Sequence, residues 1–316
     1  MRFRQHQPGD ELLRDLPLAA APAEIWAGLE AALNAGQRPP VRRRVPFWRA
    51  MLAAAACAAL AAGVYWKTRP AAPRWQVERV AGTPSIGSHP LDSTGSIREG
   101  QWLETDASSQ ALIHIGAIGT VQVGANTRVG LVAARPSEHR LTLARGRISA
   151  SVTAPPRLFF VDTPSSTAVD LGCAYSMDVD DAGNGVVHVT LGWVSLESKG
   201  RESLIPAGAS CRTRAKAGPG TPYFDDASQP LQRALVQIDF AHGGREALDA
   251  VLSESRLRDT LTLWHLLSRV DAPDRLRVFQ RMAALAPLPN GISSDKVLQL
   301  DPETLKRWRE ELAWKW

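Results

Sequence analysis

The feature that most constrains this chain is an alanine-rich stretch, residues 50–66, that contains no charged side chain. As a helix it would extend roughly 25 Å, which nearly crosses the ~30 Å hydrocarbon core of a bilayer. Aromatic pairs stand at both ends, Phe47 with Trp48 and Tyr65 with Trp66, as in the interfacial belts of membrane proteins. We therefore predict a single transmembrane helix over residues 47–66, with the membrane as a partner.

Two other interpretations of this stretch remain open, namely a buried alanine-rich helix and the apolar part of a signal peptide. The long segment before Phe47 is unusual for a signal peptide. Basic residues are more numerous before the stretch, at Arg38, Arg42, Arg43, Arg44 and Arg49, than after it, at Lys67, Arg69 and Arg74. Because positive charge is retained in the cytoplasm, this asymmetry predicts a cytoplasmic N-terminus and an extracytoplasmic C-terminus.

The formal net charge of +5 does not by itself indicate nucleic-acid binding. Much of the excess lies in the arginine cluster before residue 50, where it orients a membrane span. The sequence contains neither an RNA-recognition motif nor zinc-finger spacing. We therefore expect no direct contact with nucleic acid.

Residues 1–46 are predicted to be a cytoplasmic segment with short amphipathic helices. Asp10 is placed to cap the first helix, and the apolar faces of the two helices consist of Leu12, Leu13 and Leu16 and of Ile25, Trp26, Leu29 and Leu33. So short a segment cannot enclose a core, so these faces need a partner. A protein partner, the membrane surface and a neighbouring helix remain alternatives.

Residues 76–215 show short alternating runs separated by turn residues, which predicts an all-β sandwich, roll or solenoid. The strongest hairpin signal is Asn184-Gly185, which should connect residues 175–179 to residues 186–191. Residues 67–75 and 216–228 are predicted to be linkers. The fold class is therefore a mixed multi-domain chain with a transmembrane helix, a β domain and a C-terminal helical bundle.

Residues 229–316 have helical periodicity and should form this small α-helical domain. One helix carries Leu248, Val251 and Leu252, and the next carries Leu263, Trp264, Leu267 and Val270. Asp271 should cap a helix with Leu276, Phe279 and Ala283 facing inward. Asp301 followed by Pro302 should open a last helix with Leu305, Trp308 and Leu312.

The three cysteines, Cys57, Cys173 and Cys211, form no CxxC motif and no metal array. Outside the cytoplasm, Cys173 and Cys211 are candidates for a disulfide, and two small buried thiols are the alternative. Enzyme motifs such as GxSxG, HExxH and the P-loop are missing from the sequence, and its seven histidines are scattered. We expect no enzyme activity, no cofactor and no metal, and we attribute Asp178, Asp180 and Asp181 to a turn.

Several strings of the β region, in order, resemble the FecR domain of bacterial signal-transducing membrane proteins. They are EGQWLET at 99–105, LARGRISASV at 143–152, FFVDTP at 159–164, and the segments 169–196 and 204–211. The chain departs from the family where Gly172 is followed by Cys173 instead of threonine.

This resemblance implies structural positions rather than catalytic ones. Gly100, Gly146, Gly172, Gly192 and Gly208 should be turns or close approaches, and Thr163-Pro164 should set a bend.

The resemblance also implies a regulator in the bacterial inner membrane that passes a periplasmic event to a cytoplasmic partner, namely a sigma factor. The extracytoplasmic partner is unknown. The alternative is an envelope module that binds a protein or a glycan without control of a sigma factor. A sigma-factor gene next to the gene for this chain would favour regulation.

Overall fold

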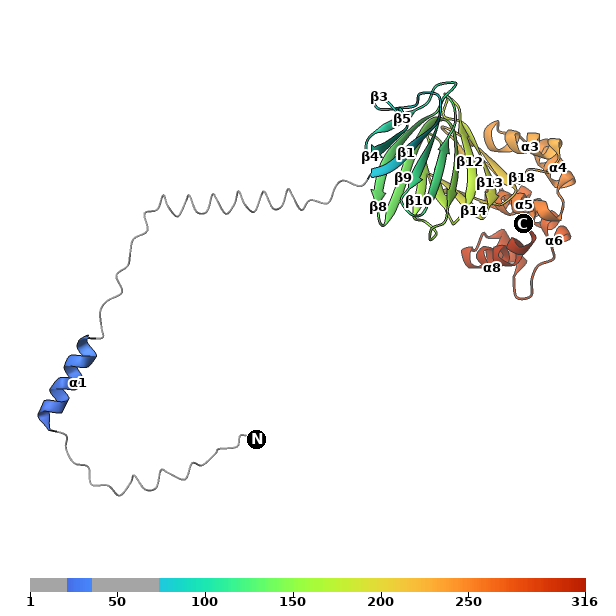
Figure 1. Cartoon of the computed structure of the whole chain (residues 1–316). Coiled ribbons are helices and arrows are strands. Elements are labelled where there is room, and N and C mark those ends of the chain that lie inside the picture. The colour runs from blue at the N-terminus through green and yellow to red at the C-terminus, as the bar shows by residue number, and fades with distance from the viewer. Residues whose placement is uncertain (1–21, 36–73) are drawn as a thin grey trace, which may run out of the picture. The chain divides into compact units, whose positions relative to one another are not determined.

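The structure, a computed structural model, describes residues 22–35 and 74–316. They belong to two units, Met1–Pro70 and Ala71–Trp316, which are considered separately (Figure 1). In the first unit the described element is helix α1, Ala23–Ala35. No helix in the described ranges has the length and apolar character required to cross a bilayer. The predicted transmembrane segment, residues 47–66, lies outside these ranges.

The second unit begins with a β-rich region, as predicted, and its strands alternate inward and outward side chains. The strands are β1 (Arg74–Ala81), β2 (Ser85–Ile86), β3 (His89–Pro90), β4 (Thr94–Arg98), β5 (Trp102–Glu104), β6 (Gln110–Ile115), β7 (Gly119–Val123), β8 (Arg128–Arg135), β9 (Glu138–Val152), β10 (Phe159–Asp162), β11 (Thr167–Asp170), β12 (Ala174–Val179), β13 (Gly185–Leu191), β14 (Trp193–Ser198), β15 (Arg201–Pro206), β16 (Ala209–Arg214), β17 (Gly218–Pro219) and β18 (Tyr223–Phe224).

These strands form two sheets that share β9. The first sheet runs β4-β1-β6-β7-β9-β12-β13-β16, with β17 and β18 beside β16. The second runs β3-β2-β5-β8-β9-β10-β11-β14-β15. Residues 146–152 of β9 pair with β7 and β12 in the first sheet, and residues 138–145 pair with β8 in the second. The strand therefore passes from one sheet to the other near Gly146.

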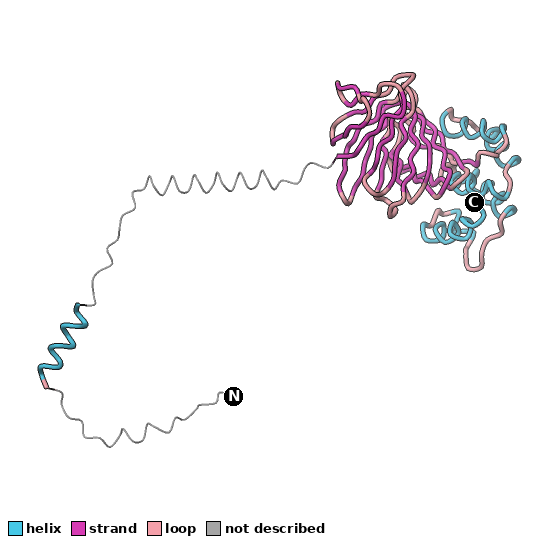
Figure 2. Tube along the Cα trace, in the orientation of Figure 1, coloured by secondary structure: helices cyan, strands magenta, loops and turns pink. Residues whose placement is uncertain are grey.

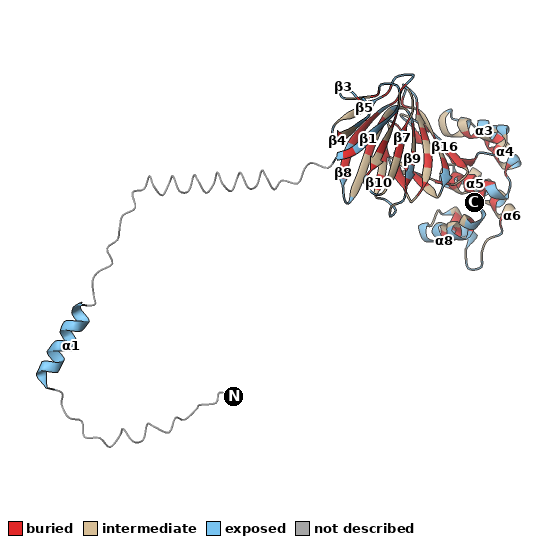
Figure 3. Cartoon of the chain, viewed as in Figure 1, coloured by how far each residue is buried: buried red, intermediate tan, exposed pale blue. Residues whose placement is uncertain are grey.

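The inner faces of both sheets contribute to one hydrophobic core. Val77 and Ile113 from the first sheet and Leu103 and Leu141 from the second are fully buried members of the same cluster. Buried residues alternate with more exposed ones along strands such as β6, and Figure 3 shows buried segments in red throughout the β region. This is the packing expected of two facing sheets.

The hairpin predicted from Asn184-Gly185 is present and joins β12 to β13. The Asp180 carboxylate accepts hydrogen bonds from the backbone N–H groups of Ala182 and Asn184, at 2.9 and 2.8 Å. These bonds explain Asp180 as a turn residue, and Asp178 pairs with Arg147 on the neighbouring strand β9.

The C-terminal helices follow, as Figure 2 shows in cyan. They are α3 (Gln229–Phe240), α4 (Arg245–Glu254), α5 (Thr260–Leu267), α6 (Ala272–Leu285), α7 (Ser294–Leu298) and α8 (Pro302–Leu312), with the 3₁₀ turns η1 (Leu257–Asp259) and η2 (Ala313–Lys315). Asp271 and Asp301 cap α6 and α8 through their side chains, as predicted.

One inward position predicted on α6 is wrong, because Leu276 is exposed. The buried residues of that helix are Val278 and Met282. The face is therefore rotated relative to the prediction, which had taken the stripe of Leu276, Phe279 and Ala283 as the core face.

The segment 216–228, predicted to be a linker, is part of the fold. Its short strands β17 and β18 both pair with β16, and residues 218–224 are buried. Tyr223 belongs to the hydrophobic cluster of the helices, and Phe224 to that of the sheets. The glycine and proline content of this segment reflects tight turns against β16, so the β region and the helices form one compact unit.

Helix α5 covers the edge strand β15. His265 Nε2 accepts a hydrogen bond from the Leu204 N–H at 3.0 Å, so Nδ1 carries the proton and donates to the Leu261 carbonyl at 2.9 Å. Arg269 donates to the Glu202 carbonyl and the Ser203 hydroxyl, and forms a buried pair with Asp239 at 3.7 Å. Polar groups of this edge that would otherwise remain unpaired are thus satisfied by helical side chains.

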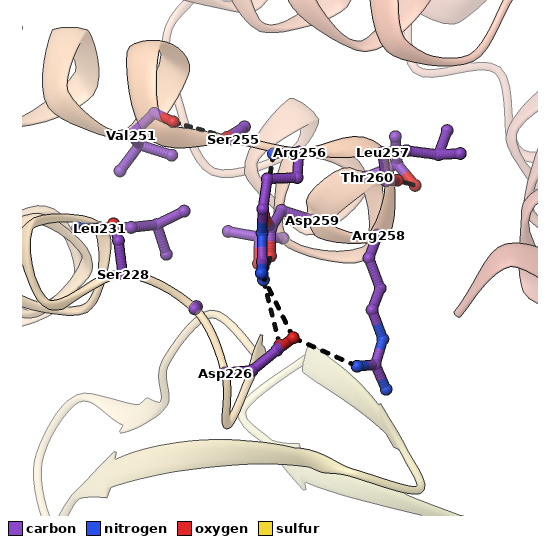
Figure 4. Close-up of polar contacts among 12 residues, drawn as sticks. Asp226, Ser228, Leu231, Val251, Ser255, Arg256, Leu257, Arg258, Asp259 and Thr260 are labelled. Carbon is purple, nitrogen blue, oxygen red and sulfur yellow. Dashed lines mark hydrogen bonds and ion pairs between the residues drawn. The ribbon is translucent and has the colours of Figure 1, made fainter.

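A second contact between the two regions is centred on Arg256, as Figure 4 shows. Its guanidinium pairs with Asp226, which follows β18, at 3.0 Å and with the fully buried Asp259 at 2.9 Å. The neighbouring Arg258 lies 3.9 Å from the ring centroid of Phe224. These arginines tie the start of the helical region to the last strand.

We predict that the free energy of unfolding falls with decreasing pH through His265. Burial, together with the charges of Arg269 and Arg309, lowers the pKa of His265 to about 3. Between pH 3 and 6.5 the unfolded chain binds a proton that the folded chain does not, so stability is lost as pH falls through this window. The contribution is at most about 1.4 kcal/mol per pH unit.

Denaturant titrations across pH would measure this dependence. His265→Gln should lower the free energy of unfolding near pH 7 and flatten its dependence on pH, and His89→Gln, at an exposed position, serves as the control. An unchanged slope in His265→Gln would contradict the assignment.

Candidate protein-binding surfaces

Helix α1 carries an exposed apolar face made of Ile25, Trp26, Leu29 and Leu33. These four side chains are between 51% and 65% exposed, and at 100° per residue they fall within an arc of about 100°. The sequence predicted this face. The other predicted members, Leu12, Leu13 and Leu16, lie outside the described residues.

An isolated helix as short as α1 is marginally stable in water. Burial of each large apolar side chain of the face against a partner would contribute about 1.5–3 kcal/mol. Such a helix can therefore dock into an apolar groove of another protein, with its anchors spaced at i, i+4 and i+8.

A groove of about 810 Å³ lies on the outer face of the second sheet, between the β10–β11 turn and the β14–β15 hairpin. Arg140 stacks over Phe160 at 4.4 Å and pairs with Asp162 at 2.7 Å. Arg157, which also lines this groove, pairs with Glu197 at 3.0 Å. We call this the sheet groove. The charges of Arg140 and Arg157 are balanced by neighbouring carboxylates, and Lys199 and Arg201 of the hairpin also line the groove.

Sequence reasoning missed the sheet groove because it depends on a parallel pairing. Arg140 and Phe160 lie opposite each other because β9 and β10 run in parallel. Nothing in the local sequence around either residue indicates that register.

The Thr163-Pro164 bend lies at the rim of the sheet groove. Thr163 donates to the Ser166 carbonyl through both its N–H and its hydroxyl, each at 2.8 Å. The Thr163 hydroxyl also accepts from the Ser166 N–H at 3.0 Å. This small network closes the turn that joins β10 to β11.

All five glycines singled out in the sequence have positive φ, namely Gly100, Gly146, Gly172, Gly192 and Gly208. Close approach is most severe at two of them. A Cβ on Gly146 would lie 2.3 Å from Thr127 Oγ1, and one on Gly192 would lie 2.3 Å from the Gly172 carbonyl oxygen. At Gly100 the surrounding space is open.

We predict that Gly146→Ala destabilises the fold by about 2–5 kcal/mol, since it combines left-handed strain with a clash against the Thr127 backbone. Gly100→Ala is the matched control. It has a similar φ and no neighbour within 4 Å, so it should cost about 1–2 kcal/mol. Chemical denaturation of both variants would test this, and equal losses would refute the close-approach role of Gly146.

Cys173 and Cys211 are both free and buried, so the predicted disulfide candidate is not formed. Strand β13 lies between β12, which follows Cys173, and β16, which contains Cys211. Two strand spacings amount to more than about 9 Å, beyond the Cα separation of about 7 Å that a disulfide tolerates. The alternative of two buried thiols describes the structure.

Both thiols are held in hydrogen bonds. Cys173 donates to Asp170 Oδ2 at 2.8 Å, and Cys211 donates to the Gly220 carbonyl at 3.1 Å. Burial is the main cause that raises the pKa of both, to about 12 for Cys211. Neither is a nucleophile at neutral pH.

Two histidines on strands, His114 and His188, lie close to carboxylates. His114 lies 3.6 Å from Glu78, and His188 Nδ1 lies 2.9 Å from Asp225. In the part of the chain that the structure describes, no cluster of three or more His, Cys, Asp or Glu residues is arranged to hold a metal.

Comparison with known proteins identifies part of the β region. Residues 101–195 match the family model of the FecR protein. Two crystal structures of a candidate anti-sigma factor from Parabacteroides distasonis, at 1.65 and 2.50 Å resolution, align with the chain at 14% identity and a TM-score of 0.35. The alignment covers 43% of this chain and 64% of the solved one, less than two thirds of its length. A search of curated proteins found no match.

Proposed function

We propose that this chain, whose residues 101–195 form a FecR-like domain, is a membrane-anchored regulatory protein without enzyme activity. In this proposal it relays an extracytoplasmic signal to a cytoplasmic protein partner. The observation that carries the proposal is the exposed apolar face of α1, on the N-terminal side of the domain.

The proposed route of the signal runs through residues 47–66. The uncharged stretch, its aromatic ends and the preceding arginines support a span with a cytoplasmic N-terminus. The FecR-like domain would then lie in the periplasm, where it can receive the signal. Helix α1 would lie in the cytoplasm, where it can bind the partner.

The proposed partner of α1 is a sigma factor. An amphipathic helix with four large apolar anchors suits a helix-in-groove contact, and loss of those anchors would release the partner. An envelope module without transcriptional control remains the second candidate. The sheet groove favours it, because it offers a formed polar surface on the FecR-like domain itself.

We predict that the chain stays in the membrane fraction after an alkaline carbonate wash. Reporter fusions should place the N-terminus in the cytoplasm and the C-terminus in the periplasm. Release of the intact chain by carbonate, or a cytoplasmic C-terminus, would remove the route through residues 47–66.

We predict that replacing Trp26 and Leu29 by aspartate abolishes the recovery of a sigma factor with the full chain. The charged side chains cannot enter an apolar groove, so the loss should exceed about 100-fold in affinity. Affinity purification from the native membrane with mass spectrometry would measure the recovery of the sigma factor. Transcript profiling would measure the resulting change in transcription.

Glu30→Gln, at an exposed position of the same helix outside the apolar arc, is the matched control and should retain the partner. If the aspartate variant recovers the same proteins and leaves transcription unchanged, the proposal fails. If wild-type chain recovers envelope proteins and no sigma factor, the envelope module is the better description.

A further inference from the structure

A second groove, of about 410 Å³, lies between the β14–β15 hairpin and helices α5 and α8. We call it the hairpin groove. The two hairpin residues Lys199 and Gly200 both have positive φ, as in a two-residue type I′ turn, so Lys199 and Arg201 are held at the groove rim. Trp264 from α5 and Arg309 from α8 complete the opposite wall.

Lys199 and Arg201, which belong to the hairpin, line both grooves, and Arg309 lines the hairpin groove. Arg140 and Arg157 of the sheet groove are both neutralised. Among the described residues, no ion pair within 4.0 Å involves Lys199, Arg201 or Arg309. Arg269 also lines the hairpin groove, but it is buried and paired with Asp239. Three unpaired cations therefore surround one cavity.

Glu202, the carboxylate that lines this groove, offsets only part of the charge of Lys199, Arg201 and Arg309. Glu202 accepts a hydrogen bond from the Ser195 hydroxyl at 2.9 Å, and no ion pair within 4.0 Å involves it in the described part of the chain. The positive charge extends to the buried wall, where Arg269 and Arg309 add to the effect of burial in lowering the pKa of His265. The groove thus presents a positive potential to an incoming ligand.

An aromatic surface lies beside these charges. The Arg309 guanidinium lies 5.7 Å from the ring centroid of Trp264, which lines the groove. The buried Trp264 Nε1 has no hydrogen-bond partner in the described part of the chain. A ligand with both carboxylates and small apolar groups would match this combination.

We propose that the hairpin groove binds an acidic peptide segment of a protein partner, whose carboxylates pair with Lys199, Arg201 and Arg309. The cations come from a hairpin on one side and from a helix on the other, so they suit several carboxylates spaced along an extended chain. A single small anion would reach fewer of them. This inference does not depend on the partner of α1 or on the membrane topology.

Fluorescence anisotropy with the full chain in neutral detergent tests the proposal. The probe is a short labelled peptide of alternating glutamate and alanine, and glutamine replaces glutamate in its neutral counterpart. The acidic peptide should bind, the neutral one should not, and added salt should weaken binding. Equal binding of both peptides would overturn the proposal.

Two variants locate the site. Arg309→Gln and Lys199→Asn should each weaken binding about tenfold, as expected for loss of one charge-assisted contact. Asparagine tolerates the positive φ of Lys199, so this variant keeps the turn. Arg307→Gln, an exposed position on the same helix as Arg309, is the matched control and should leave binding unchanged.

Thermal melts confirm that each variant is folded. Equal weakening by Arg307→Gln would show a diffuse charge effect and refute the groove as the site. Inorganic phosphate and a sulfated polysaccharide serve as competitors. If either binds through Lys199 and Arg309 more tightly than the peptide does, the assignment of a peptide ligand is wrong.

Discussion

The pairing of β9 with four other strands is the constraint on which the rest of the β region depends. Its first half joins β8 and β10, and its second half joins β7 and β12. One continuous strand therefore holds both sheets in register and encloses the core between them. β9 passes from one sheet to the other where Gly146 packs directly against Thr127, with no room for a Cβ atom. The arrangement of the two sheets therefore depends on the close approach of these two residues.

The helical region completes this arrangement at the far edge of the second sheet. His265 and Arg269 satisfy polar groups of β15, and Arg256 anchors the start of the helices near β18. The β14–β15 hairpin consequently separates two surfaces of different character. Lys199 and Arg201 of the hairpin line both surfaces. In the sheet groove they lie beside Arg140 and Arg157, whose charges are balanced by carboxylates, and in the hairpin groove they lie opposite Arg309 of α8.

Local signals in the sequence predicted local structure well. The Asn184-Gly185 hairpin and the caps Asp271 and Asp301 depend on neighbouring residues alone, and they are present. Features that depend on contacts between residues far apart in the sequence were missed or predicted wrongly, because local sequence patterns do not indicate which distant segments pair. They are the double role of β9, the burial of residues 218–224, the strand that separates Cys173 from Cys211, and the opposition of Arg140 to Phe160. The exposed face of α1 was predictable because helical spacing suffices to define it.

The hydrogen bond from the Leu204 N–H to His265 joins the β region to the helical region, and it can be followed by hydrogen exchange. That proton is shielded by an imidazole from another part of the chain, so solvent reaches it when α5 separates from the edge strand. The exchange rate of the Leu204 amide proton therefore reports how often the helical region detaches from β15. This proton should exchange more slowly than the amide protons of an uncovered edge strand.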